Sequence, residues 1–353
     1  MRIFAILHEP AQYTTDRNRA VYEPVGVHYA YMHGQSEAKS DEAAIGKALS
    51  ELSWWQLVKW TFRLLRDNDI IIMNGYNNMV FIMLFMLNTF YGRAIGIDSD
   101  TPLSVPQNPL KRMLKAAYLR TIFTNRHIYG LAGGSQSHKE LFRHYGMKEN
   151  HIFLMPMMVN NEKFYNHSDA VKPRPFTFLY VGRIVECKNL CVLLQAFSKA
   201  FEDNNDVQLR LVGGGELLDD YKRQYSGFAN IIFAGKKYGE DLIKEYHKAN
   251  AFVLPSSYEP WGLVVNEALC AGLPVIVSDR VGAAHDLVEG KGTGFVFRYD
   301  DVADLANRMR EIVTDEKLYE QCSQNAKRLM RDKWNYDFYT NSLNSFIEYV
   351  SKR

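Results

Sequence analysis

The sequence predicts an α/β protein built from two doubly wound parallel-sheet domains that face one another across a cleft. Short apolar runs alternate with helix-length segments along the whole chain, a pattern typical of parallel strands covered by helices. The 353 residues are enough for two cores rather than one. A polar stretch, residues 166–175 (NHSDAVKPRP), divides the pattern into two halves and is typical of a linker.

The first half alternates five predicted strands with four predicted helices. The strands are short apolar runs, at residues 2–7, 69–73, 93–97, 128–132 and 152–155. The helices are longer segments, at residues 54–66, 79–91, 109–122 and 135–145. Within the second helix, the nine apolar residues 79–87 are too few to cross a bilayer and predict a buried helix. The segment from His8 to His33 is predicted to be a long loop.

The second half repeats the scheme. Its strands are predicted at residues 177–181, 208–212, 230–233, 251–254, 274–277 and 294–297, and its helices at residues 189–201, 216–224, 241–248, 263–270, 302–314 and 316–332. The terminal stretch 335–350 is aromatic and amphipathic, which predicts a helix that crosses back to the first domain. The predicted domains are therefore residues 1–165 together with 335–353, and residues 166–334.

Composition excludes several classes of protein. The net charge of +2 gives no reason to expect nucleic acid as a partner. The four cysteines form no CxxC pair and no cluster with histidine, which argues against a zinc site or a disulfide framework and indicates a reducing compartment. The apolar run at the N-terminus is too short for a signal peptide. A cytoplasmic location is expected.

The turn after the first strand of the second half contains two cations that could face one point. It reads LYVGRIVECKNL, where Gly182 lets the backbone bend and Arg183 and Lys188 follow. A guanidinium and a mobile ammonium can clamp a diphosphate and neutralise its charge without a metal. The alternative is a solvated turn with two surface cations.

Two further turns contain glycine directly after a strand. Gly213 opens the run GGG, but Leu218 stands where a dinucleotide fingerprint needs its third glycine, so NAD is disfavoured. That glycine could serve close helix packing or a close ligand. Gly235 and Lys236 end the next strand, where backbone groups could read the edge of a base or simply form an ordinary connection.

The segment SSYEPWGLVVNEALCAGLPVIVS, residues 256–278, places two carboxylates at one end of a strand–loop–helix unit. Glu259 precedes a Pro-Trp-Gly bend, and Glu267 lies inside an apolar helix. Carboxylates accept hydrogen bonds from hydroxyls, and amides at a helix N-terminus favour anions. A charge among apolar neighbours costs free energy unless it has a partner, and a ligand hydroxyl would be one. A sugar attached to a phosphate offers both kinds of group.

Together these segments resemble the retaining glycosyltransferases of family 4, which have the GT-B fold of two Rossmann-like domains. The matching pieces, in order, are VGRIVECKN, LVGGGEL, FAGKK, PSSYEPWGLVVNEALCAGLPVIVS and GTGFVF, which span about residues 176–298. In the first half, GGSQSHKELFRHYGMKENHIFLMPMMVNNEKFY resembles the family's last N-terminal strand–helix–strand. The resemblance implies that residues 166–334 bind the nucleotide-sugar donor and that residues 1–165 form the acceptor side.

The resemblance also implies a role for each matching position. Arg183 and Lys188 would hold the donor diphosphate, beside Gly182 and Gly213. Glu267 would accept hydrogen bonds from the ribose hydroxyls, and Glu259 would bind hydroxyls of the transferred sugar. The remaining donor contacts would come from residues near the base and from backbone amides that touch sugar and phosphate: Gly235, Lys236, Trp261, Gly262, Leu263 and Val264. Asp286 falls where the family more often has a glutamate, and only a supporting role is expected of it.

Two features depart from the family pattern. The loop after the first strand usually has a glycine pair, but here it shows only Gly26 before Gly34, with Arg17 and Arg19 as possible substitutes. The family histidine that faces the sugar is absent, and the sequence GIDSDTPLS offers Asp98 and Asp100 instead. Either aspartate could act as a base toward an acceptor hydroxyl.

The alternative interpretation of this segment is structural. Asp98, Ser99 and Asp100 could form a turn that caps a helix beginning near Pro102.

A basic stretch, residues 111–127 from Lys111 to His127, interleaves cations with apolar side chains. Such a helix can lie on an anionic membrane, which would suit a lipid-linked acceptor, or it can simply present a basic outer face to solvent.

The resemblance implies a retaining, metal-independent hexosyltransferase that uses a UDP- or GDP-sugar. Its acceptor would be a hydroxyl of a glycan or a lipid-linked sugar in polysaccharide or glycolipid biosynthesis. No aspartate pair stands where a donor metal is expected, so no metal ligand is assigned. Two alternatives stay open: a nucleotide-sugar or glycan-binding protein without turnover, and another GT-B enzyme such as a sugar-nucleotide epimerase or an inverting transferase.

Overall fold

The computed structural model describes residues 1–34, 48–166, 174–202 and 204–353, and in these residues the chain forms two compact units. Unit 1 comprises Met1–Val159 and Tyr336–Arg353, and unit 2 comprises Asn160–Asn335. Most of the predicted linker, residues 166–175, lies outside the described residues. Every predicted strand and helix is present within two residues of its predicted ends.

The boundary between the units falls earlier than predicted, between Val159 and Asn160 instead of after residue 165. The reason is the short helix α7 (Asn161–Phe164), which packs against helices of unit 2. The side-chain amide of Asn161 donates hydrogen bonds to the carbonyl oxygens of Met330 and Trp334, at 3.0 and 2.8 Å. These contacts attach residues 161–165 to unit 2.

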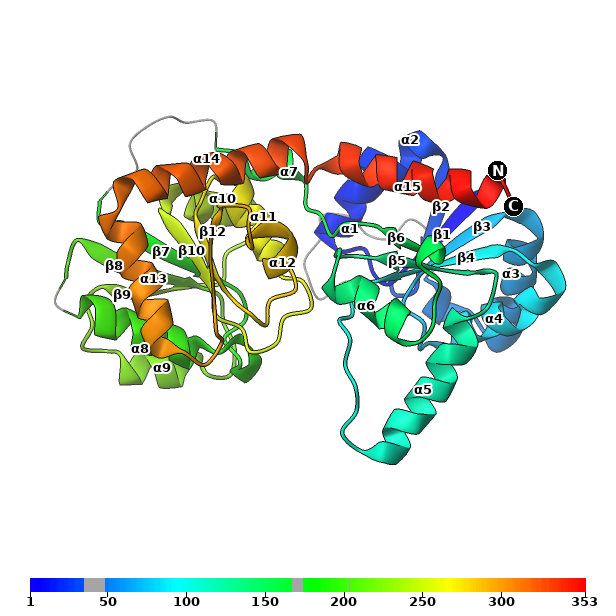
Figure 1. Cartoon of the computed structure of the whole chain (residues 1–353), viewed down its shortest axis with the longest axis horizontal. Helices are drawn as coiled ribbons and strands as arrows, with labels where there is room; N and C mark the ends of the chain where they lie inside the picture. Colours follow the sequence, from blue (N-terminus) through cyan, green and yellow to red (C-terminus); the bar gives the residue numbers. More distant parts are fainter. Residues whose placement is uncertain (35–47, 167–173, 203) are drawn as a thin grey trace. The chain divides into compact units, whose positions relative to one another are not determined.

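Unit 1 is built on a six-stranded, fully parallel sheet in the order β2-β1-β3-β4-β5-β6 (Figure 1). Its strands are β1 (Ile3–Leu7), β2 (Val27–Tyr31), β3 (Ile70–Asn74), β4 (Ala94–Ser99), β5 (Ile128–Ala132) and β6 (Ile152–Leu154). The four central strands are almost wholly buried, as expected for a parallel sheet covered on both faces.

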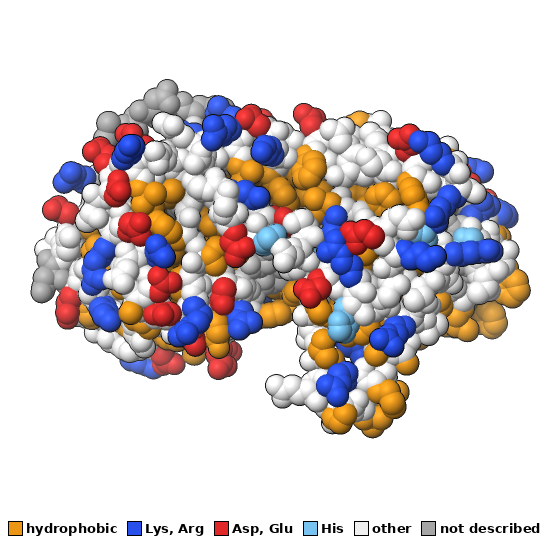
Figure 2. Space-filling view, viewed as in Figure 1, with side chains coloured by type: hydrophobic (Ala, Val, Ile, Leu, Met, Phe, Trp, Pro, Cys, Tyr) orange, Lys and Arg blue, Asp and Glu red, His pale blue; other side chains and the backbone are white. Residues whose placement is uncertain are grey.

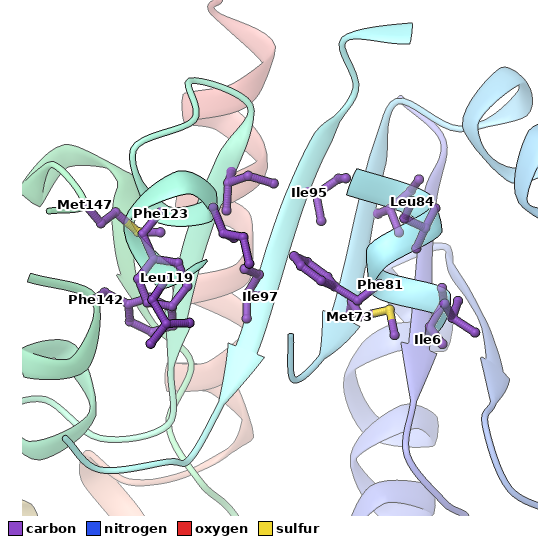
Figure 3. Close-up of a cluster of buried hydrophobic side chains, with 14 of the residues drawn as sticks. Ile6, Met73, Phe81, Leu84, Ile95, Ile97, Leu119, Phe123, Phe142 and Met147 are labelled. Carbon is purple, nitrogen blue, oxygen red and sulfur yellow. The ribbon is translucent and has the colours of Figure 1, made fainter. Parts of the chain in front are cut away.

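The core of unit 1 lies between this sheet and four helices. They are α3 (Trp54–Asp67), α4 (Met79–Tyr91), α5 (Pro109–Phe123) and α6 (Ser137–His144). Each helix contributes buried side chains to one cluster with the strands, such as Leu84 from α4, Leu119 from α5 and Phe142 from α6 (Figure 3). These four helices therefore cover the same face of the sheet.

The segment between His8 and His33 is not a loop, and this prediction is wrong. It forms α1 (Gln12–Arg17), a π-helical turn (Asn18–Tyr22), α2 (Glu23–Val25) and the edge strand β2. Gly26 ends α2 in the left-handed conformation. Strand β2 pairs with β1 on one side only, so its sequence, VHYAY, has partly exposed polar positions instead of a continuous apolar run.

Helix α4 is only half buried, although its sequence predicts a buried helix. Val80, Phe81 and Leu84 face the core, whereas Met86 and Phe90 are exposed. The terminal helix α15 (Tyr336–Ser351) belongs to unit 1 and packs on β6 and the π-helical turn.

Unit 2 is built on a second fully parallel sheet, in the order β12-β11-β10-β7-β8-β9. Its strands are β7 (Phe176–Val181), β8 (Val207–Val212), β9 (Ile231–Gly235), β10 (Ala251–Leu254), β11 (Val275–Ser278) and β12 (Gly294–Phe297). Besides α7, its helices are α8 (Leu190–Phe201), α9 (Leu218–Gln224), α10 (Gly239–Lys248), α11 (Leu263–Cys270), α12 (Ala284–Leu287), α13 (Val302–Thr314) and α14 (Glu316–Asp332).

Candidate functional site

The strand order of unit 2 has a switch point between β7 and β10. From β7 the chain proceeds to β8 and β9 on one side, and from β10 to β11 and β12 on the other. The connections that leave the carboxyl ends of β7 and β10 therefore run in opposite directions, and in open α/β sheets ligands bind beside such a switch point. The predicted donor residues of both connections lie at this edge.

Glycines let the turns after β7, β8 and β9 approach one another closely. The Gly182 amide donates to the Val212 carbonyl at 3.0 Å, and the Gly213 amide donates to the Gly235 carbonyl at 2.9 Å. A Cβ atom on Gly213, whose φ is 150°, would lie 1.8 Å from the carbonyl oxygen of Gly182. The sequence left open close helix packing or a close ligand for Gly213, whereas the structure shows that this glycine packs closely against the backbone of the β7 turn. This contact fixes the positions of the two turns relative to one another.

Backbone and side-chain hydrogen bonds hold the loops after β7 and β10 together. Asn189, in the left-handed conformation, donates from its side-chain amide to the carbonyl oxygens of Pro255 and Tyr299, at 3.2 and 2.7 Å. The Ser257 amide donates to the Cys187 carbonyl at 2.9 Å. These bonds fix the positions of the residues beside them, Lys188 and Glu259.

Lys188 and Glu259 form an ion pair across the switch point. Both side chains are only about one-seventh exposed, at 14% and 13%. The sequence assigned Lys188 to the phosphates and Glu259 to the sugar, and the structure places the two groups in direct contact. A phosphorylated sugar bound here would therefore meet both charges at its phosphate–sugar junction.

The other two predicted cations are exposed at the same edge. Arg183 follows Gly182 directly, and its carbonyl oxygen accepts a 2.6 Å hydrogen bond from the Tyr180 hydroxyl, which fixes the backbone of this turn. Lys236 lies beyond β9 with its aliphatic stem against Gly214. Neither guanidinium nor ammonium is buried, so both are free to reorient toward a ligand without a large desolvation cost.

The Pro-Trp-Gly bend is a rigid support for the start of α11. Glu259 forms an isolated parallel bridge with Val281, and Gly262 is left-handed, with a φ of 96°. The indole of Trp261 is buried, donates to the side-chain oxygen of Asn266 at 2.9 Å and stacks on Trp334 with ring centroids 5.6 Å apart. Its side chain therefore serves the core.

The bend still offers a ligand its backbone. The amides of Leu263 and Val264 lie in the first turn of α11, where an α-helix supplies no acceptor. Together with Gly262 they can donate to an anion or to a sugar oxygen.

Glu267 has a partner that the sequence did not indicate. Its carboxylate accepts a 2.6 Å hydrogen bond from the hydroxyl of Tyr246, on α10. Burial raises the pKa of Glu267 to about 7, and the Tyr246 hydrogen bond opposes this only in part. No sequence signal marks Tyr246, since it lies in an ordinary amphipathic helix 21 residues away.

Asp98 and Asp100 lie in unit 1. Asp98 lies in β4, next to its last residue, and is buried, with Arg17 at 3.6 Å and a 2.9 Å hydrogen bond from the Asn74 amide. Burial raises the pKa of Asp98 to about 6, against the lowering effect of the Arg17 charge. Asp100 is exposed.

The capping alternative for this segment is wrong, because no helix begins at Pro102 and the next one starts at Pro109. Arg17 does not act as a free substitute for the family's glycine pair either: its guanidinium stacks on Tyr22, 4.7 Å from the ring centroid, and pairs with Asp98.

Asp286 is buried in α12. Among the residues that the structure describes, no group of three histidine, cysteine or acidic side chains is placed to hold a metal ion.

The region that contains the predicted donor residues resembles known proteins in sequence. Residues 170–329, which contain every predicted donor residue, match the family model "Glycosyl transferases group 1". Mannosylfructose-phosphate synthase of Agrobacterium fabrum is 27% identical over 227 residues, 59% of this chain and 50% of that protein. An Escherichia coli UDP-Gal:alpha-D-GlcNAc-diphosphoundecaprenol alpha-1,3-galactosyltransferase is 30% identical over 199 residues, 52% of this chain and 50% of that protein. The chain thus spans about half the length of these curated relatives.

Solved structures extend the likeness to the whole chain. Alr3699/HepE of Anabaena, solved in complex with UDP, superposes with a TM-score of 0.76 at 15% sequence identity, covering 99% of this chain and all of that one. Sucrose-phosphate synthase of Thermosynechococcus elongatus superposes with a TM-score of 0.71 at 19% identity, covering 100% of both chains. Two Rossmann-like units, each with a six-stranded parallel sheet, give this chain the GT-B fold of glycosyltransferases, and its residues 170–329 match their group 1 family model.

Proposed function

We propose that this protein is a retaining glycosyltransferase that moves a hexose from a nucleotide diphosphate sugar to an acceptor hydroxyl. The observation that carries the proposal is the Lys188–Glu259 pair at the switch point of unit 2, within the region that matches group 1 glycosyltransferases. A cation beside a carboxylate suits the junction between a phosphate and a sugar. UDP is the proposed nucleotide, because structural neighbours are solved with UDP and with UDP-glucose.

In the proposed reaction the protein stabilises the charge that develops as the diphosphate leaves. Lys188 and Arg183 neutralise the departing phosphate oxygens, and the amides of Gly262 to Val264 donate to them, so no metal is required. Glu259 accepts hydrogen bonds from the sugar hydroxyls and orients the ring. The acceptor oxygen attacks the face that the diphosphate leaves, so the anomeric configuration is retained. The leaving phosphate takes the proton that the acceptor loses.

Glu267 is proposed to hold the ribose of the donor. Two adjacent ribose hydroxyls can both donate to a carboxylate, and Tyr246 fixes the carboxylate from the other side. Gly235 and Lys236, at the end of β9, are proposed to lie beside the base. The arrangement of β7, β9 and α11 around one sheet edge supports these roles.

The acceptor is proposed to be a hydroxyl of a growing glycan or of a lipid-linked sugar, at the cytoplasmic side of a membrane. Support for a lipid-linked acceptor comes from the E. coli relative, whose name contains a diphosphoundecaprenol sugar. The basic stretch 111–127 is proposed to contact the membrane, and within it Met113, Leu114 and Tyr118 are exposed. No helix in the described part of the chain is long and apolar enough to span a bilayer.

Turnover of UDP-sugars and GDP-sugars, with the anomeric configuration of the product read by NMR, tests the proposal. The expected result is a retained linkage, unaffected by EDTA, with activity lost in Glu259→Ala. An inverted linkage would exclude the retaining mechanism, and loss of activity in EDTA would exclude metal independence. Binding of a nucleotide sugar without any turnover across a panel of acceptors would favour the non-catalytic alternative instead.

A further inference from the structure

Helix α4 carries an apolar stripe on its outer surface. Met79, Ile82, Met86 and Phe90 are exposed, with Phe90 84% accessible, and their spacing of three or four residues aligns them along one side of the helix. The opposite side fills the core of unit 1 with Val80, Phe81 and Leu84 (Figure 3). A helix that is apolar on every side is normally covered on every side.

Aromatic side chains continue this surface on α3. Trp54, Trp55 and Phe62 are exposed, Trp55 at 72%. Helices α3 and α4 pack side by side on the same face of the sheet, as their contacts and the shared core cluster show. Trp60, in contrast, turns inward and packs edge-on against Phe4, at 5.9 Å between ring centroids.

Helix α5 extends the apolar surface at its projecting end. Leu110, Met113 and Leu114 are exposed there, at about 60% each. Figure 1 shows this end of α5 standing away from the sheet, and Figure 2 shows orange and blue side chains gathered on it. The outer surface of α3, α4 and the projecting end of α5 is called the helical face below.

The charges of the helical face are almost all positive. Helix α4 has no charged residue, and α3 and α5 together contain one carboxylate, Asp67, which is engaged by Arg66. The cations of α3 and of the projecting end of α5 are Lys59, Arg63, Arg66, Lys111, Arg112 and Lys115. An uncharged, apolar stripe is thus bordered on both sides by cations.

We propose that the helical face is the surface by which this protein docks on an anionic lipid bilayer, with the α4 stripe and the two α3 tryptophans inserted among the headgroups. Lipid phosphates complement the flanking cations, and tryptophan favours the boundary between headgroups and acyl chains. This extends the proposed membrane contact of residues 111–127 to two further helices, and it requires no step of the proposed glycosyl transfer.

A second copy of the chain fits this surface less well. A two-fold dimer would place each helical face against its own copy and bring six cations of one chain toward six of the other. Such like charges repel unless carboxylates intervene, and Asp67 alone cannot balance them. Charge complementarity therefore favours lipid.

Flotation of the full chain with vesicles tests the proposal. The vesicles contain phosphatidylcholine alone or with about one-third phosphatidylglycerol, and the protein is expected to float only with the anionic ones and to dissociate at high salt. The double variant Lys59→Glu/Arg63→Glu is expected to bind at least about tenfold more weakly. A matched control, Lys222→Glu/Lys317→Glu, makes the same change in net charge on exposed helices of unit 2 and is expected to bind like the wild type.

Apolar insertion is tested separately with Met86→Glu/Phe90→Glu and with tryptophan fluorescence. Both substituted side chains are exposed, so the variant is expected to keep the melting temperature of the wild type while losing flotation. Anionic vesicles are expected to blue-shift the fluorescence of the wild type but not of Trp54→Phe/Trp55→Phe, since the other three tryptophans are wholly or largely buried.

Two outcomes would overturn the proposal. One is equal flotation of the wild type, Lys59→Glu/Arg63→Glu and Met86→Glu/Phe90→Glu. The other is the absence of flotation together with a dimer, seen by light scattering, that Met86→Glu/Phe90→Glu disrupts. A thermal shift with UDP on the same preparations reports donor binding, so a failure of membrane docking is distinguished from a failure of the proposed function.

Discussion

At the scale of single residues, the Lys188–Glu259 pair would couple binding of the phosphate to binding of the sugar in the proposed donor site. Without a ligand, Glu259 neutralises Lys188 in a largely buried setting. A diphosphate must compete with this carboxylate for the ammonium, whereas an intact nucleotide sugar can satisfy both groups at once. In the proposed donor site the pair would therefore disfavour a free nucleotide diphosphate relative to the intact nucleotide sugar, which would assist product release.

Substitution of either partner is expected to have a different effect on nucleotide binding. Lys188→Ala removes a charge-assisted hydrogen bond and should weaken UDP and UDP-sugar alike, by about tenfold to a hundredfold. Glu259→Gln frees Lys188 and should weaken only the UDP-sugar, leaving UDP bound as well as or better than by the wild type. Isothermal titration calorimetry measures both. Equal losses for UDP and UDP-sugar in Glu259→Gln would contradict the assignment of Glu259 to the sugar.

Glu267 links stability to pH. Its pKa is about 7 in the folded protein, against an ordinary value of 4.5, because burial disfavours the charged form. Between pH 4.5 and 7 the folded protein therefore binds a proton that the unfolded chain has released, and the free energy of unfolding falls as the pH rises through this window.

The glutamine side chain of Glu267→Gln does not titrate, so the variant should lack this contribution to the pH dependence of the unfolding free energy. From pH 5 to pH 8 the difference in unfolding free energy between Glu267→Gln and the wild type is expected to shift in the variant's favour, on the order of 2 kcal/mol. Urea unfolding at the two pH values measures the shift. The nearby Cys270 does not interfere, because burial holds the pKa of its thiol well above the ordinary value. A difference that does not change with pH would contradict the raised pKa.

At the scale of elements, the glycine turns of unit 2 are fixed by backbone packing. Gly213→Ala would force a Cβ atom to within 1.8 Å of the Gly182 carbonyl oxygen, and we expect it to destabilise the protein by about 1–3 kcal/mol and to weaken UDP binding by displacing the β7 turn. Gly227→Ala is the matched control, since no atom lies within 4 Å of its Cβ position. It is expected to be neutral or slightly stabilising. Thermal unfolding measures the stability of both variants, and calorimetry measures their affinity for UDP. Similar losses of stability and affinity in the two variants would argue against the close contact between Gly213 and Gly182.

The elements that the sequence predicted correctly are those with a strong apolar pattern of the right length. The eleven strands other than β2 show this pattern, whereas the edge strand β2 does not, since its pairing with β1 alone leaves polar side chains on it. For α4, in contrast, the apolar pattern predicted more burial than the structure shows. Its apolar character predicted burial, and only the structure shows that one side has no covering element in unit 1 among the described residues.

In the candidate site, too, some features could be predicted from the sequence and others could not. Lys188 and Glu259 were singled out by their residue types and by their places in the connections after β7 and β10, and the structure brings the two side chains together. Tyr246 and the Arg17–Asp98 pair were not predicted, because each contact joins positions far apart in the chain whose residue types are common. Sequence periodicity reports which face of an element is buried, but not which distant side chain it meets.

At the scale of the whole molecule, unit 1 is completed only by the end of the chain. The chain leaves unit 1 after Val159 and returns at Tyr336, so the buried side chains of α15 reach their partners after all of unit 2 has been synthesised. Tyr339 joins the buried group around Arg17, and its hydroxyl lies 3.3 Å from that of Tyr22. Unit 2, in contrast, is one continuous segment.

Phe346 tests how far α15 stabilises unit 1. Its ring is fully buried, packs on Phe153 and Tyr129 with centroids 5.2 and 5.5 Å apart, and fills space that Gly96 leaves open in β4. Phe346→Ala should therefore cost about 3–5 kcal/mol, a large share of the stability of one domain. In this variant, hydrogen exchange is expected to accelerate in β4, β5 and β6 but not in unit 2. The control Glu348→Ala, on the exposed side of the same helix, should change neither the stability nor the exchange rates. Faster exchange throughout both units would show instead that they unfold together, and that α15 stabilises the whole chain.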